Sequence, residues 1–168
     1  FYPASLNASD FIEGGGALKI LNRIEEAFCG TALLITTIVL FVNVVLRYVF
    51  NASTTWAEEL IKYLMIWIAF IGGSICVREG AHVSIDFFYE YLSEKGMKVV
   101  LIIVNSIAVV FCLLMAIYGM QTIQFTINTG QVSPALQLPM WIPYLAIPLG
   151  FILMTIRYAQ EIVKTIKK

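Results

Sequence analysis

Polar side chains that could do chemistry are concentrated in residues 43–86, in an otherwise apolar sequence. Their types could form ion pairs, cap helices or relay protons. Because a charge in or beside lipid is costly, each of these side chains needs a partner or a function. The candidate site residues of this stretch are Arg47, Trp56, Glu58, Glu59, Arg78, His82 and Asp86.

The first group surrounds a short connection between two apolar runs. Arg47 precedes Glu58 by 11 residues, which allows an ion pair between adjacent helices or a contact with a partner subunit. Residues 55–58, Thr-Trp-Ala-Glu, also fit a capping box, in which hydroxyl and carboxylate oxygens accept from free backbone N–H groups. Lys62 follows Glu58 by one helical turn and is expected to pair with it. Ion pairing and helix initiation both stay open as explanations of Glu58.

The second group, Arg78, His82 and Asp86, is spaced at four-residue intervals. These side chains would share one face and resemble a proton relay if the helix continued through Gly80. Glycine is a poor helix former, so a local cluster that fixes a turn at the inner membrane surface is favoured over a relay.

Cofactor chemistry has little support in this sequence. The chain has one histidine, whereas a bis-histidine haem needs two, so a haem would require a ligand from a partner. The three cysteines form no Cys-x-x-Cys pair and are interpreted as small apolar residues. We therefore predict no catalytic, cofactor-binding or metal-binding residue, no cofactor and no enzyme activity.

The composition predicts an all-α membrane protein. Of 168 residues, 60% are hydrophobic and 13% are charged, against about 25% charged residues in soluble domains. A formal net charge of zero indicates no basic surface for nucleic acid. Apolar runs at about residues 29–49, 60–77, 99–120 and 140–156 have the roughly 17–25 residues that a transmembrane helix needs. We therefore expect four transmembrane helices.

The segments outside these runs are more polar. Residues 17–28 have apolar residues at helical spacing and a polar face, which favours a short interfacial amphipathic helix. The alternative is an ordinary helix that leads straight into the first span. A second interfacial helix is expected at residues 82–96. Residues 1–16 are expected to be a linker, a remnant of protein expression or a flexible extension, which leaves residues 17–168 as a single four-helix transmembrane domain.

Basic residues set the expected orientation in the membrane. With both termini in the cytoplasm, nine of the 11 Lys and Arg residues lie on the inner side, as the positive-inside rule requires. The loop 121–139 carries no charge and suits the outer face, either as a surface turn or as a docking surface for a periplasmic partner.

Charges are absent from the part of the spans where transporters usually bind substrate. Such sites lie near the membrane midplane, in broken helices lined by polar residues. Residues 65–77 carry no charge, and Gly72-Gly73-Ser74 instead suits close helix packing. The chain is therefore not expected to carry substrate alone.

The ordered combination of polar residues resembles one known family. It consists of Asn43, Arg47-Tyr48-Val49-Phe50-Asn51, Trp56-Ala57-Glu58-Glu59, Tyr63, Gly72-Gly73, Arg78 and His82-Val83-Ser84-Ile85-Asp86. This order looks like the small membrane subunit, of the DctQ or SiaQ type, of tripartite ATP-independent periplasmic (TRAP) transporters. The similarity covers about residues 19–168 in length and topology, and its specific part is residues 43–86.

The resemblance implies a transport system of three parts in the bacterial inner membrane. A soluble periplasmic binding protein captures an organic acid, a large membrane subunit carries it inward with sodium, and the small subunit packs against the large one. The implied partners are the large TRAP membrane subunit, the periplasmic substrate-binding protein and membrane lipids. The seven candidate residues would then stabilise the fold or the subunit interface.

The predicted function is therefore a non-catalytic small permease subunit of a sodium-coupled transporter for organic acids. It would scaffold the large subunit and help to dock the binding protein. Four-carbon dicarboxylates and sialic acids are both family substrates, and nothing in these residues chooses between them. Two other classes stay open: a membrane anchor subunit of a redox or quinone enzyme, and an autonomous small homo-oligomeric transporter.

Overall fold

The computed structural model describes residues 16–52, 54–80 and 94–167. The helices are α1 (Gly16–Val49), α2 (Thr55–Gly80), α4 (Glu94–Thr129), α5 (Trp141–Tyr144) and α6 (Ala146–Lys167). Four membrane-spanning candidates are long and apolar enough to cross a bilayer, and the described ranges contain no β-strand beyond one isolated bridge. The predicted all-α fold with four spanning helices is confirmed.

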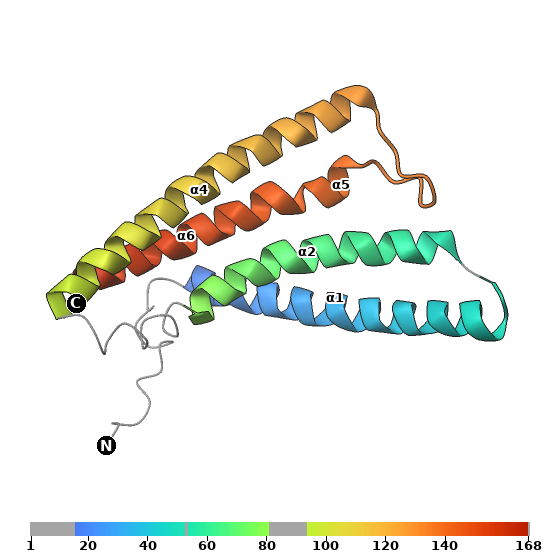
Figure 1. Ribbon diagram of the computed structural model, residues 1–168, viewed down its shortest axis with the longest axis horizontal. Coiled ribbons are helices and arrows are strands. Elements are labelled where there is room, and N and C mark those ends of the chain that lie inside the picture. Colours follow the sequence, from blue (N-terminus) through green and yellow to red (C-terminus); the bar gives the residue numbers. More distant parts are fainter. Residues whose placement is uncertain (1–15, 53, 81–93, 168) are drawn as a thin grey trace, which may run out of the picture.

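The long helices lie side by side in the order α1, α2, α6, α4 (Figure 1). Helices α2 and α6 each pack against two long neighbours, whereas α1 and α4 form the two edges. The start of α1 and the end of α6 lie at the same end of this layer. The end of α1, the start of α2 and the loop between α4 and α5, residues 130–140, lie at the opposite end, which we call the loop end.

Helix α1 settles the alternatives for its first residues. It runs without a break from Gly16 to Val49, so residues 17–28 lead straight into the first span. No proline interrupts this segment, and two of its polar residues, Asn22 and Glu25, contact Arg157 on α6. Most of the expected interfacial helix at 82–96 lies outside the described residues.

Two glycines allow α6 to approach both of its neighbours closely. A Cβ atom on Gly150 would lie 2.6 Å from Cβ of Phe70 on α2 and 2.8 Å from its carbonyl oxygen. A Cβ atom on Gly119 of α4 would lie 3.1 Å from Cδ of Pro148 on α6. Aromatic rings fill the adjacent space, since Phe151 contacts both Phe70 and Phe111 edge to face. Helix α6 therefore packs closely against both α2 and α4.

The last span is interrupted near its start. Helix α5 ends at Tyr144 and α6 begins at Ala146, with Leu145 between them. Pro143 and Pro148 flank this break, and both are fully buried. Because proline has no backbone N–H, Pro148 removes one helical hydrogen bond and favours a bend here.

Candidate functional site

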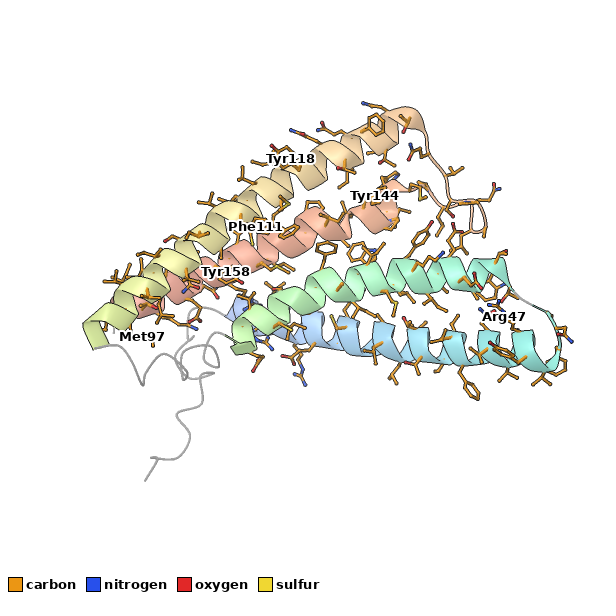
Figure 2. All side chains as sticks on the ribbon, viewed as in Figure 1. Arg47, Met97, Phe111, Tyr118, Tyr144 and Tyr158 are labelled. Atoms are coloured by element: carbon orange, nitrogen blue, oxygen red, sulfur yellow. The ribbon has the colours of Figure 1, made fainter. Side chains whose placement is uncertain are left out.

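The ion pairs within the described residues form clusters near the two ends of the helix layer, and Figure 2 shows Arg47 at the loop end. Between these ends the helices are uncharged: residues 28–46, 63–77, 99–120 and 141–156 contain no Asp, Glu, Lys or Arg. The clusters must therefore be understood as contacts between helix ends.

Arg47 and Glu58 meet across the α1–α2 turn at the loop end. Nη1 of Arg47 lies 3.8 Å from Oε1 of Glu58, and the two side chains are 62% and 47% exposed. The pairing expected for Lys62 is wrong, since Lys62 forms no ion pair within the described ranges. Glu58 turns toward α1 instead, where the planar guanidinium offers more donors than an ammonium group.

Helix α2 does not begin with the predicted capping box. Thr54, just before the helix, donates its hydroxyl to Oδ1 of Asn43 at 2.7 Å, and its N–H points to the same atom at 3.4 Å. Asn43 is only 7% exposed, so this partly buried contact joins α1 to the residue that precedes α2. Asn51 has a φ of 49°, a left-handed conformation that asparagine tolerates in tight turns. The hairpin is thus fixed by Asn43 and Thr54.

Glu59 connects α2 to the 130–140 loop. Its Oε2 accepts from Ser133 Oγ at 2.9 Å and from two consecutive backbone N–H groups, of Ala135 at 3.0 Å and Leu136 at 2.7 Å. Its Oε1 accepts from the Tyr63 hydroxyl at 3.1 Å. Such charge-assisted bonds are stronger than neutral ones. Trp56, one turn before Glu59, is half-exposed.

The uncharged loop is folded rather than loose. The N–H of Ser133 donates to Leu138 O at 2.8 Å, and the N–H of Gln137 donates to Ser133 O at 3.1 Å. Met140 N–H donates to Gln131 O at 3.0 Å, which closes the base of the turn. The carboxylate of Glu59 therefore completes a hydrogen-bonded turn whose own peptide groups hold its shape.

Arg78 lies at the opposite end of the layer. Its Nη2 atom lies 2.5 Å from Oε1 of Glu26 on α1 and 3.0 Å from Oε1 of Glu79. The pair with Glu26 joins α1 and α2 where the sequence predicted a cluster with His82 and Asp86. Those two residues lie outside the described ranges.

One buried cluster was missed by the sequence analysis. Nη2 of Arg157 lies 3.1 Å from Oε2 of Glu25, each side chain is only 3% exposed, and Arg157 also donates to Oδ1 of Asn22. The available signal was a lone arginine directly after the last apolar run. The last apolar run is predicted to end at residue 156, which places Arg157 among the basic residues of the inner side and does not reveal its burial.

These clusters are suited to holding helices together. Within the part of the chain that the structure describes, no group of three or more His, Cys, Asp or Glu residues could hold a metal ion. The outward surfaces of the edge helices are largely apolar, with side chains such as Leu34, Phe41 and Ile107 more than 60% exposed. Lipid or another membrane protein must cover such surfaces, because water cannot do so without cost.

Comparison with known proteins gives a consistent result. The sequence model of the family described as "Tripartite ATP-independent periplasmic transporters, DctQ component" matches residues 36–168. A protein of Haemophilus influenzae described as a TRAP transporter small permease is 32% identical over 146 residues, which cover 87% of this chain and 89% of the relative.

Two further relatives carry substrate names. The C4-dicarboxylate TRAP transporter small permease protein DctQ of Rhodobacter capsulatus is 27% identical, over 85% of this chain and 76% of the relative. The sialic acid TRAP transporter permease protein SiaT of Haemophilus influenzae is 31% identical over 85% of this chain, which amounts to 23% of that longer protein.

Proposed function

The chain belongs to the DctQ component family of tripartite ATP-independent periplasmic transporters, and from this membership we propose that it is a non-catalytic scaffold subunit for sodium-coupled uptake of an organic acid. Its relatives are transporter permease subunits and not enzymes. With four candidate spans, it is a multi-pass inner-membrane protein. Both of its termini would lie in the cytoplasm, and the 130–140 loop in the periplasm.

The proposal that a large membrane subunit is the partner rests on the length of one relative. This chain matches 23% of the permease SiaT, so most of that protein has no counterpart here. A large membrane subunit would supply the counterpart. The apolar edge at α4 offers it a surface compatible with contact inside the bilayer.

A single observation carries the scaffold role: charged groups lie at helix ends and the helix middles are uncharged. Moving a polar substrate through a membrane requires polar groups near the midplane. The same arrangement suits a brace that is fixed at both membrane surfaces. The proposed brace involves the seven candidate residues, which would stabilise the fold or the subunit interface: Arg47, Trp56, Glu58, Glu59, Arg78, His82 and Asp86.

The 130–140 loop is the proposed contact for the periplasmic binding protein. Glu59 holds this loop through three hydrogen bonds to one carboxylate oxygen, so its exposed residues Val132, Pro134 and Gln137 are presented in a defined shape. A preorganised surface binds with a smaller loss of entropy than a loose one.

Reconstitution tests this function. The large subunit and the binding protein are placed in proteoliposomes with and without this chain, and uptake of labelled C4-dicarboxylate or sialic acid is followed under a sodium gradient. We expect uptake of one of the two acids only when this chain is present and sodium is supplied. Equal uptake without the chain would contradict the scaffold role, and uptake independent of sodium would contradict the coupling.

A further inference from the structure

A pocket of about 320 Å³ opens between α1 and α2 at the loop end. Its lining has a charged part and an apolar part. The charged part consists of Arg47, Glu58 and Lys62, and the apolar part includes Leu40, Val44 and Ile61. The pocket is therefore amphipathic, with charges close to the turn and apolar side chains farther along the spanning helices. Arg47 and Glu58 also belong to the proposed brace, but no role proposed above places a ligand in this space.

The charges of the pocket leave one positive charge in excess. Arg47 and Lys62 contribute two cations, and Glu58 contributes one anion. The Arg47–Glu58 contact is long at 3.8 Å and engages few of the guanidinium donors. Lys62 makes no ion pair in the described portion of the protein. The pocket can therefore accept one further negative charge without displacing a strong internal bond.

The apolar lining continues onto the outer surface of α1. Leu40 and Val44 are 47% and 44% exposed, and the neighbouring Phe41 is 69% exposed. In a bilayer this surface would face hydrocarbon, and Lys62 can extend its ammonium group toward the headgroups while its stem stays in the apolar layer. A ligand that combines an anionic head with a long apolar chain would match both parts of the lining.

We propose that this pocket binds one anionic phospholipid, with its phosphodiester between Arg47 and Lys62 and an acyl chain along Leu40 and Val44. Arginine suits this role because its fork of N–H groups matches phosphate oxygens. An acidic side chain of another subunit would satisfy the charge but not the apolar lining that runs along α1. The site requires only that the hairpin lies in a membrane, so it does not depend on the proposed transport role.

Lipid binding can be measured on the complex purified from membranes. After delipidation, the sample is titrated with phosphatidylglycerol or with zwitterionic phosphatidylcholine, and bound lipid is counted by native mass spectrometry. Basic side chains near a membrane surface each strengthen anionic lipid binding about fivefold. We expect one phosphatidylglycerol per chain, bound more than tenfold tighter than phosphatidylcholine, and a loss of this preference in the Arg47→Gln/Lys62→Gln double variant.

Two further variants keep the test independent of folding. Lys62→Gln alone removes no ion pair of the described structure and should weaken phosphatidylglycerol binding about fivefold while the protein stays monodisperse. Lys98→Gln removes an exposed cation of α4 outside the pocket and should leave binding unchanged. Equal binding of both lipids, or equal losses in Lys62→Gln and Lys98→Gln, would overturn the proposal. So would occupation of the pocket by an acidic side chain of the large subunit, detected as a cross-link to Lys62.

Discussion

Arg157 on α6 and Glu25 on α1 form an ion pair at 3.1 Å in which each side chain is only 3% exposed. Helix α2 lies between α1 and α6 in the order of packing, so this pair connects two helices that are not direct neighbours along most of their length. Together with the Arg78–Glu26 pair, it joins three helices at the end of the layer opposite the loops.

Loss of either partner of this buried pair should be strongly destabilising. Arg157→Leu leaves the Glu25 carboxylate buried without its cation, a situation that costs about 3–5 kcal/mol. Thermal unfolding of the detergent-solubilised protein, followed by size-exclusion chromatography, would show the loss. The double variant Glu25→Leu/Arg157→Leu should recover much of the stability, because no unpaired charge remains.

The control for this prediction is the Glu161–Lys164 pair within α6. It is more exposed, at 14% and 36%, so Lys164→Gln should cost at most about 1 kcal/mol. If Arg157→Leu were as mild as Lys164→Gln, the buried pair would not hold α1 to α6.

Glu59 should control the order of the 130–140 loop. In Glu59→Ala, the backbone N–H groups of Ala135 and Leu136 lose their acceptor, and hydrogen bonds to charged groups contribute about 1.5–3 kcal/mol. Amide hydrogen exchange at these two residues should therefore accelerate about tenfold or more. Glu58→Ala removes the same charge one residue earlier and should leave their exchange unchanged. Equal exchange rates of the Ala135 and Leu136 amides in the two variants would contradict the proposal that Glu59 holds the loop.

The close approach of α2 and α6 depends on Gly150. In Gly150→Ala the new methyl group would lie 2.8 Å from the carbonyl oxygen of Phe70, so the helices must separate, at a cost of about 1–3 kcal/mol. Gly30→Ala is the matched control, because a Cβ atom there meets nothing within 4 Å. Alanine is the better helix former, so this control should be neutral or slightly stabilising. Thermal unfolding of both variants checks the difference, and equal stabilities would contradict it.

Arg47 should matter more for transport than for folding. Its pair with Glu58 is exposed, so Arg47→Ala should reduce the free energy of unfolding by no more than about 1 kcal/mol. We expect Arg47→Ala to lower reconstituted uptake more than Lys62→Ala, because the planar guanidinium is harder to replace. Unfolding and uptake are measured on the same preparations. If Arg47→Ala and Lys62→Ala both left uptake nearly unchanged, Arg47 would have no role in transport.

Much of this structure could be predicted from hydropathy, because the four apolar runs have the length of membrane spans. The Arg47–Glu58 contact also follows from spacing, since a short turn brings both residues to the same end of a hairpin. The hydrogen-bond partners of the polar side chains were harder to predict. The capping-box pattern at Thr55 and Glu58 is local, whereas Thr54 is held by Asn43 on another helix, and a tertiary contact of this kind leaves no sequence pattern.

Two contacts that join distant segments could not be predicted because they too are tertiary contacts without a sequence pattern. Glu59 precedes Ser133 by 74 residues and Glu25 precedes Arg157 by 132, and neither pair has a helical spacing that could reveal it. Both depend on the order in which the helices pack. A charge directly beside an apolar run, such as Arg157, is the one local sign that a buried partner was needed.

A distance measurement during transport tests the scaffold claim most directly. Spin labels would be placed at Leu34 of α1 and Ile107 of α4, which are exposed on the two edge helices, after replacement of the free cysteines Cys29, Cys76 and Cys112 by alanine. A rigid scaffold predicts the same label distance, within about 2 Å, with and without sodium and substrate. A shift of about one helical turn, roughly 5 Å, would show that this chain moves with the substrate and would contradict the scaffold role.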